Sequence, residues 1–183
     1  MNNVRASHTA SVLLDVRVLV TGGFSLFSNI SKTRELYDPL TGTWTLTSDM
    51  NDGRAFDHQV SLLADGRVLV TGRSTTNYYR IAELYDPTTG NWSITGQMDN
   101  ERAIHGAALL PNGKVLVVGG SVRNTDLENA ELYDPLTEMW SQTDDMEFDR
   151  VSPRTSVLLD GTVLVTGDKD WEMEAGTAEL YSY

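Results

Sequence analysis

The 183-residue chain contains no cysteine. This absence excludes a disulfide framework, a thiolate metal site and a thiol nucleophile, and it fits a reducing compartment. Basic residues are also scarce, because 14 Lys and Arg stand against 26 Asp and Glu and give a formal net charge of −12. Such a surface repels phosphate backbones and anionic membranes, so we expect neither a nucleic-acid partner nor membrane insertion.

Long apolar runs are missing as well. No run approaches the roughly 18 residues that a membrane helix needs, and the opening MNNVRASHTA lacks the basic and then apolar layout of a signal peptide. The sequence leaves the compartment open between the cytoplasm and secretion after processing. With 40% apolar residues in short runs, the chain can bury the core of one compact unit or of one array of small units.

What the chain does contain is an internal repeat, with a period of 48 residues. Three residue types keep this spacing throughout: Tyr37, Tyr85, Tyr133 and Tyr181; Trp44, Trp92 and Trp140; and Met50, Met98 and Met146. The repeats cover approximately residues 1–50, 51–98, 99–146 and 147–183. We expect them to form a single domain over residues 1–183.

Each repeat has the pattern of short strands joined by tight turns. The four VLV-type runs begin at Val18, Val68, Val115 and Val163, and a turn pair such as Asp65-Gly66 precedes each run at hairpin spacing. Glu83–Tyr85 and Asn91–Ile94 then flank the turn DPTTG, which predicts a second hairpin. Four strands in about 48 residues, without helical periodicity, predict a blade of a β-propeller. The repeated tyrosine and tryptophan are interpreted as core residues packed between blades.

The repeat resembles the kelch motif, in the subgroup that includes the central domain of galactose oxidase. The resemblance rests on the double glycines Gly22-Gly23 and Gly119-Gly120, on the tyrosine that precedes a tryptophan, and on the phrase DGRVLVTG at residues 65–72. It covers essentially the whole chain. It implies an all-β kelch-type propeller with about four blades of four antiparallel strands.

The chain departs from this pattern in three places. Two double glycines are broken by Arg73 and Asp168, and Asp15-Val16 replaces the usual turn pair. The fourth repeat has no counterpart of Trp44, so the last blade is expected to be incomplete. An uncovered strand edge invites association, and we therefore expect self-association through the last blade. A closed four-bladed ring, part of a larger propeller and a multichain ring all stay open, and four blades is our preferred interpretation.

The segments between the glycine and the third strand differ most among the repeats: GFSLFSNISKT, RSTTNYYRI, GSVRNTDLENA and DKDWEMEAGT. Variable loops on a rigid scaffold are a common way to build a binding site. We call these segments the variable loops and take their aromatic and charged side chains as binding candidates: Phe24, Phe27, Tyr78, Tyr79, Arg80, Arg123, Asp126, Trp171, Glu172 and Glu174. A solvated face without binding function is the alternative.

A second set of candidates opens each repeat and would gather near the axis of a propeller: Arg5, His8, Arg54, His58, Arg102, His105 and Arg150. Three equivalent histidines could form a metal site, but local hydrogen bonding is the preferred interpretation, and no metal is assigned. Asp168, Asp170, Glu172 and Glu174 alternate along the fourth loop, which leaves calcium as a weak possibility. No cofactor is otherwise expected.

No local pattern indicates catalysis. The cross-linked tyrosine and cysteine of galactose oxidase chemistry would require a cysteine, and no GxSxG elbow, HExxH helix or dinucleotide fingerprint is present. The sequence therefore favours a non-catalytic module that presents its variable loops to a protein or carbohydrate partner. The alternative is a small enzyme or sugar-binding protein with a site at the axial channel.

Overall fold

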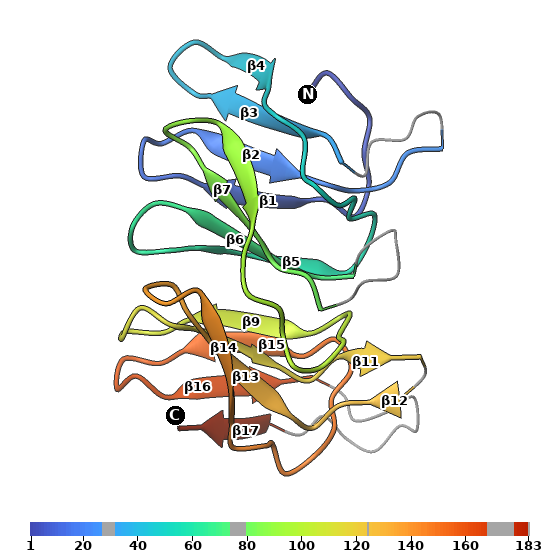
Figure 1. Cartoon of the computed structure of the whole chain (residues 1–183), viewed down its shortest axis with the longest axis vertical. Helices are drawn as coiled ribbons and strands as arrows, with labels where there is room; N and C mark the ends of the chain where they lie inside the picture. Colours follow the sequence, from blue (N-terminus) through green and yellow to red (C-terminus); the bar gives the residue numbers. More distant parts are fainter. Residues whose placement is uncertain (27–31, 74–79, 124, 168–177, 183) are drawn as a thin grey trace. The chain divides into compact units, whose positions relative to one another are not determined.

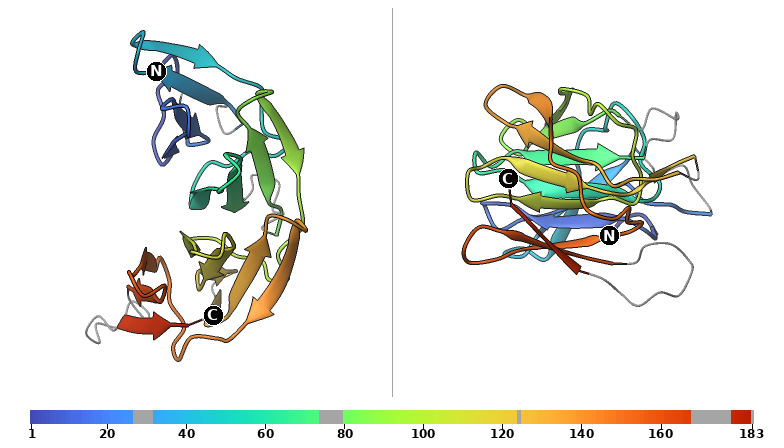
Figure 2. Two further views of the ribbon diagram at one scale, coloured as in Figure 1. Left: turned by 90° about the vertical axis from the view of Figure 1, so that its left-hand side faces the viewer. Right: turned by 90° about the horizontal axis from the view of Figure 1, so that it is seen from below.

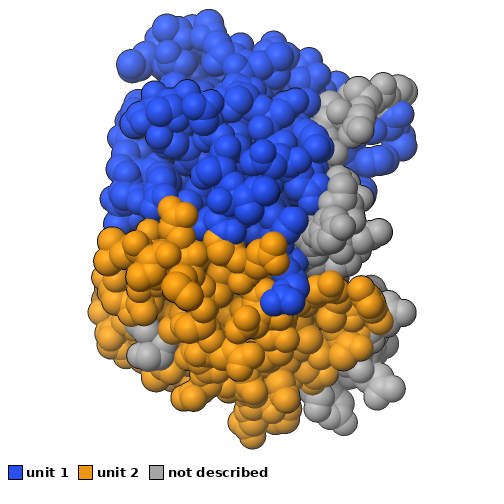
Figure 3. Space-filling model, viewed as in Figure 1, with its two compact units in different colours: residues 1–95 blue, residues 96–183 orange. Residues whose placement is uncertain are grey.

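The computed structural model describes residues 1–26, 32–73, 80–123, 125–167 and 178–182. Within these ranges the regular structure is entirely β-strand (Figure 1), and no helix is long and apolar enough to cross a membrane. The chain divides into two compact units, residues 1–95 and 96–183 (Figure 3).

The first unit contains two four-stranded antiparallel sheets, and the strands of each sheet follow one another in sequence order. The first sheet consists of β1 (Thr9–Val12), β2 (Val18–Thr21), β3 (Arg34–Asp38) and β4 (Thr43–Leu46). The second consists of β5 (His58–Leu62), β6 (Val68–Gly72), β7 (Glu83–Asp86) and β8 (Asn91–Ile94). The antiparallel course of β7 and β8 can be followed in Figure 2.

The second unit repeats this arrangement with two differences. Its first sheet consists of β9 (Gly106–Leu109), β10 (Val115–Val118), β13 (Ala130–Asp134) and β14 (Met139–Thr143), and the small hairpin β11 (Ser121–Val122) and β12 (Thr125–Asp126) lies between β10 and β13 in the sequence. Its second sheet has three strands in the described ranges, β15 (Arg154–Val157), β16 (Val163–Thr166) and β17 (Ala178–Tyr181). The last blade thus shows three strands in the part of the chain that the structure describes, in line with the sequence prediction.

The repeated tyrosines occupy one register. Tyr37, Tyr85, Tyr133 and Tyr181 stand opposite Val18, Val68, Val115 and Val163 in the second strand of their sheets. On the other side, each of the first three faces the tryptophan of its own repeat, with ring centroids 4.9 to 5.1 Å apart. The predicted strands, hairpins and aromatic core are therefore confirmed as the blades of an all-β, propeller-type fold.

Each sheet has two apolar faces, because side chains alternate along a strand. The valine–tyrosine face of a repeat carries its tyrosine and the valines beside it, such as Val68, Val70 and Tyr85. The leucine face carries the leucines of the second and third strands, such as Leu19 and Leu36. In the first unit these five residues lie in one buried cluster, so the leucine face of one blade packs on the valine–tyrosine face of the next.

The second unit packs in the same way. Leu116 of the third repeat lies in a cluster with Val163, Val165 and Tyr181 of the fourth, and Leu132 packs against it. The tyrosine hydroxyls add a polar contact from the preceding repeat, because Tyr85 lies 3.0 Å from the Thr47 hydroxyl and Tyr181 lies 3.0 Å from that of Thr143. Two neighbouring blades are thus joined by a buried apolar layer with a hydrogen bond at its margin.

The unusual turn pair of the first repeat keeps the geometry of the glycine turns. Val16 has a φ of +68°, while Gly66, Gly113 and Gly161 at the same place have φ values of +84° to +92°. The Val16 amide still donates to the Leu13 carbonyl at 3.1 Å, as the Gly66 amide donates to that of Leu63 at 3.0 Å. The first repeat therefore holds a β-branched residue in a backbone conformation that suits glycine.

Candidate functional site

The arginine that opens each repeat is buried beneath the start of a variable loop. Arg102, whose exposed fraction is 0%, donates to the carbonyl of Gly119 at 2.9 Å and to that of Asn129 at 3.1 Å. It also donates to the carboxylate of Glu131 at 2.7 Å, and neither side chain of this pair is exposed. Burial lowers the pKa of the Arg102 guanidinium. We refer to this arginine, the two carbonyls and the glutamate as the arginine clasp.

The whole clasp recurs in the first three repeats, and the fourth repeat shows its arginine, first carbonyl and glutamate within the described residues. Arg5 binds the carbonyls of Gly22 at 2.6 Å and Thr33 at 3.1 Å and the carboxylate of Glu35 at 2.9 Å. In the second repeat, Arg54 binds the carbonyls of Gly72 and Ile81 and lies 3.6 Å from Glu83. In the fourth, Arg150 binds the Gly167 carbonyl at 2.6 Å and Glu179 at 2.7 Å. In the first three repeats the bound carbonyls lie at the start and at the end of one variable loop, so one guanidinium holds both ends together.

The glutamate of the clasp also binds the chain that enters its repeat. Glu131 accepts from the amides of Asp99 at 2.6 Å and Asn100 at 3.0 Å. Glu35 accepts in the same way from the amides of Asn2 and Asn3. Burial alone would raise the pKa of Glu35, but these amides and Arg5 outweigh burial, and the pKa lies below its ordinary value.

These glutamates were missed by the sequence interpretation, although their signal was present. Glu35, Glu83, Glu131 and Glu179 share the 48-residue period and stand two residues before the repeated tyrosine. Their partners are the arginines that we had assigned to an axial channel. Each of these four guanidinium groups is bound within its own repeat, to loop ends and to the glutamate.

The intact double glycines lie where two blades meet. The Gly23 amide donates to the Arg54 carbonyl at 2.9 Å, and the Gly120 amide donates to the Arg150 carbonyl at 2.8 Å. Gly119 has a φ of +61°, and a Cβ at this position would lie 2.7 Å from the Arg150 carbonyl oxygen. The pair is therefore needed for close contact with the next repeat, and each unit has one such contact.

The three histidines lie in different surroundings. His8 is exposed, whereas the exposed fractions of His58 and His105 are 3% and 0%. The His58 Nε2 lies 2.9 Å from the Thr9 hydroxyl of the preceding blade. His58 therefore contacts the preceding blade. In the described part of the chain there is no group of three or more His, Cys, Asp or Glu side chains that could hold a metal ion.

His58 should make the protein less stable in acid. Burial first, and then the nearby charge of Arg54, lower the pKa of His58 from 6.5 to about 3. Since the folded state resists this protonation, stability falls as the pH drops from about 6.5 towards 3. Between pH 7.5 and pH 4.5, wild type should therefore lose about 2 to 3 kcal/mol of unfolding free energy that His58→Gln does not lose.

Urea unfolding at the two pH values measures this change. Leu40→Gln is the control, because Leu40 is 86% exposed and carries no titratable group, and its difference from wild type should not depend on pH. Parallel pH profiles for wild type and H58Q would show that His58 does not limit acid stability.

Phe24 of the first variable loop packs within its own unit. Its ring centroid lies 5.2 Å from that of Phe56, which precedes the second blade, and the exposed fraction of Phe24 is 38%. Arg73, at the start of the second loop, lies 3.5 Å from Asp57, and Arg80 at the end of that loop is exposed. The loop end of the first unit thus presents a small aromatic pair and exposed charges.

The loop end of the second unit is built on the hairpin β11–β12. Arg123, in its turn, has a side chain that is 78% exposed and lies 3.5 Å from Glu101. Asp126 ends β12 and is half-buried. The hairpin starts directly after Gly119 and Gly120, so the third clasp supports it.

Several candidates lie outside the described residues. They are Phe27, Tyr78, Tyr79, Trp171, Glu172 and Glu174, together with Asp168 and Asp170 of the possible calcium site. Their roles stay predictions.

Arg34 is a further buried charge that sequence reasoning missed. Its exposed fraction is 0%, its guanidinium carbon lies 4.6 Å from the centre of the Trp92 ring in the next blade, and it pairs with Asp49 at 3.4 Å. Burial lowers its pKa to about 9. The other repeats have Ala82, Ala130 and Ala178 at this position, so a comparison of repeats would have singled it out.

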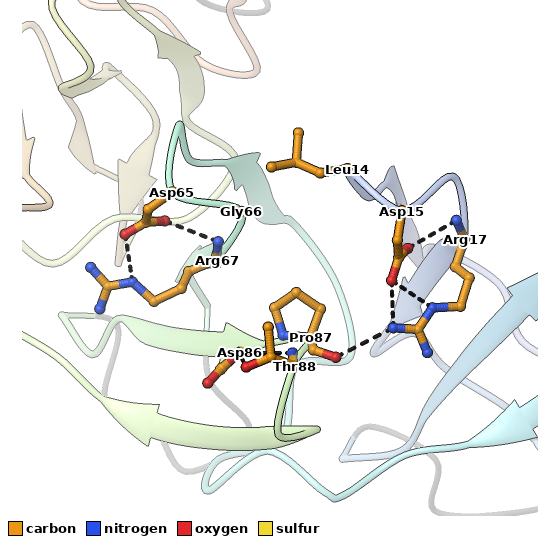
Figure 4. A pocket seen from close by; sticks show the side chains of 9 residues that line it. All are labelled: Leu14, Asp15, Arg17, Asp65, Gly66, Arg67, Asp86, Pro87 and Thr88. Carbon is orange, nitrogen blue, oxygen red and sulfur yellow. Dashed lines mark hydrogen bonds and ion pairs between the residues drawn. The ribbon is translucent and has the colours of Figure 1, made fainter.

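A pocket of about 390 Å³ lies at the opposite end of the first unit, among the tight turns (Figure 4). Arg17 binds Asp15 through two nitrogens at 2.8 and 2.6 Å and reaches the Pro87 carbonyl at 3.3 Å, while Arg67 binds Asp65 at 2.8 Å. The hydrogen bond from Arg17 lowers the pKa of Asp15. These ion pairs lie within the tight turns that recur in the repeats. We therefore assign the pocket to the packing of the turns and do not count it as a candidate binding site.

Comparison with known proteins agrees with the geometry. A model of the kelch motif matches residues 5–51 and 105–147, and no curated protein sequence matches the chain. A fungal alcohol oxidase, described as having catalytic diversity among the AA5 family and solved in complex with copper, is 16% identical with a TM-score of 0.59. The alignment covers 98% of this chain and 52% of the oxidase, so the chain spans about half the length of that protein, and the likeness concerns the fold alone. The chain therefore carries the kelch motif in its first and third repeats, and its antiparallel sheets fit the blades of a propeller built from that motif.

Proposed function

We propose that the chain is a binding module that holds a protein partner through its variable loops. Kelch repeats are in general protein-interaction modules, and this chain carries them. The observation that carries the proposal is the arginine clasp. In the first three repeats a buried guanidinium joins the two ends of a variable loop. The two ends of each of these loops are fixed, while the sequence of the loop between them differs from repeat to repeat. This is the arrangement of a binding scaffold.

The described loop residues fit a protein surface. Phe24 is 38% exposed, and Arg80 and Arg123 are exposed arginines. Aromatic and arginine side chains commonly dominate the energy of protein interfaces. The same side chains could hold a carbohydrate by stacking and hydrogen bonding, and this partner class is the alternative that the experiment separates.

An enzyme or sugar-binding site built from the repeated arginines has less support. The four arginines are bound to carbonyls and to a glutamate of their own repeat. His58 is committed to a contact between blades. No contact among the described residues favours catalysis at these groups.

The test compares a loop variant with a control variant that is changed only in exposed turns. The loop variant combines Phe24→Ser, Arg80→Ala, Arg123→Ala and Asp126→Ala. The control combines Leu40→Ala and Leu136→Ala, which are 86% and 93% exposed in the turns at the opposite end of their sheets. Partners are captured on immobilised wild type, identified by mass spectrometry and purified, and their Kd is then measured for all three proteins.

We expect the loop variant to raise the Kd at least about tenfold and the control to change it less than twofold. An unchanged Kd for the loop variant, or an equal loss in the control, would contradict the proposal. Binding of the wild type to a panel of immobilised glycans, with no protein captured, would move the assignment to a carbohydrate partner. Circular dichroism should show that both variants keep the β-sheet signal of the wild type.

A further inference from the structure

The turn between the first two strands of the third repeat differs from its counterparts in one side chain. Three repeats have an aspartate at this place in the turn, and the third has an asparagine: Asp15, Asp65, Asn112 and Asp160. In each of them a side-chain oxygen accepts the backbone amide two residues further on, at 3.0 to 3.1 Å. Asparagine and aspartate therefore occupy this turn with the same hydrogen bond.

The side chain of Asn112 has fewer contacts than the three aspartates. Each aspartate also accepts from the side chain two residues further on, at 2.6 to 2.8 Å: Asp15 from Arg17, Asp65 from Arg67 and Asp160 from Thr162. In the third repeat the residue at that place is Lys114, which pairs instead with Asp134 at 3.4 Å. Asn112 is exposed, and in the part of the chain that the structure describes its side-chain nitrogen has no hydrogen-bond partner.

The residue that follows Asn112 leaves its side-chain carbon open to attack. Gly113 has a φ of +84°, and nothing lies within 4 Å of the place that a Cβ would take. The Gly113 nitrogen can therefore close a five-membered ring on that carbon once it releases its 2.9 Å bond to the Leu110 carbonyl, which needs only a local opening of the turn. Negative charge then develops on the Asn112 Oδ1, which already accepts the Lys114 amide at 3.0 Å.

We propose that Asn112 is a site of spontaneous deamidation in the folded protein. The Gly113 nitrogen gives up its proton and bonds to the Asn112 side-chain carbon, the bond from that carbon to the side-chain nitrogen breaks, and ammonia leaves with the proton. Water then opens the ring at one of its two carbonyl carbons and gives aspartate or isoaspartate. The change adds a negative charge at the turn end of the second unit and is separate from the proposed binding by the variable loops.

The aspartate product completes the pattern of the other repeats. Its carboxylate would keep the bond from the Lys114 amide and would have the Lys114 ammonium group as a new partner, as Asp65 has Arg67. Isoaspartate places an extra CH2 group in the backbone instead. It would disturb the bonds between Leu110 and Lys114 and between Gly113 and Leu110, which close the hairpin of β9 and β10.

The experiment incubates the purified chain in mildly alkaline buffer made with water enriched in oxygen-18. The protein is then digested with trypsin in ordinary water, and mass spectrometry follows the peptide of residues 103–114, which ends at Lys114. Only deamidation during the incubation introduces the heavy oxygen. We expect Asn112 to react at least about tenfold faster than Asn91, an exposed asparagine that Trp92 follows in place of glycine.

Two variants complete the test. Asn112→Gln should take up no heavy oxygen at this position on the same time scale, because its longer side chain would have to close a larger ring. Asn112→Asp serves as the standard for the aspartate product, and its melting temperature should equal that of wild type. A lower melting temperature for N112D would contradict the fit of the product.

Two results would overturn the proposal itself. One is an unlabelled peptide 103–114, or labelling at Asn112 that is no faster than at Asn91. The other is a labelling rate that rises with low urea as steeply as the globally unfolded fraction, since a local opening exposes little surface and depends on urea only weakly. Neither result bears on the loop proposal, which is tested by the Kd of a partner.

Discussion

Replacing Arg102 by methionine is expected to lower the free energy of unfolding by about 3 to 5 kcal/mol. Methionine keeps most of the buried stem but removes every donor. Glu131 would then remain as a buried carboxylate without its 2.7 Å partner, and the Gly119 and Asn129 carbonyls would each lose a bond. An unpaired buried charge is among the largest single penalties known in folded proteins.

Urea unfolding followed by circular dichroism measures this loss. Arg123→Met is the matched control, because its pair with Glu101 is 3.5 Å long and its side chain is 78% exposed, and an exposed pair contributes less than about 1 kcal/mol. Hydrogen exchange should also become faster at the amides of residues 120–129 in R102M. A cost below about 1 kcal/mol, or unchanged exchange, would mean that the clasp does not hold the loop.

Gly119→Ala is the second change with a large expected effect. The added Cβ would lie 2.7 Å from the Arg150 carbonyl oxygen, which accepts the amide of Gly120. The clash involves backbone atoms of both repeats, so it can be relieved only if the third repeat moves away from the fourth. We therefore expect a loss of at least about 3 kcal/mol, which combines the strain of a positive φ with this clash.

Gly42→Ala separates these two contributions. Gly42 has a φ of +68°, close to the +61° of Gly119, but nothing lies within 4 Å of its added Cβ. This variant should lose only about 1 kcal/mol, from backbone strain alone. Equal losses for G119A and G42A in the same urea experiment would show that the contact between the blades tolerates the extra atom.

The fold could be predicted from the sequence because each of its signals is local and repeated. The turn pair Asp65-Gly66 and the segments Glu83–Tyr85 and Asn91–Ile94 specify their strands through short-range rules, and β6, β7 and β8 lie where those rules place them. The hairpin β11–β12 could not be predicted, because it lies in a loop that shares no pattern with the other repeats.

Only the arginines of the clasp could be identified from the sequence. The period identified Arg102 and its equivalents, but which groups they bind depends on how three separate segments meet in space. Glu131 was hidden because it stands within a strand, where a charged residue is usually exposed. Arg34 shows the opposite case, since a charge that replaces alanine in one repeat of four is visible only when the repeats are compared.

Because the clasp closes the first three variable loops, these loops can differ in length as well as in sequence. Since the ends are joined by the guanidinium, whatever lies between them must only span a fixed gap. The entropy of closing a flexible segment grows with the logarithm of its length, so doubling such a segment costs only about 0.6 kcal/mol. Insertions at these positions should therefore reduce the free energy of unfolding only slightly. Evolution can then change the length of these segments as well as their sequence.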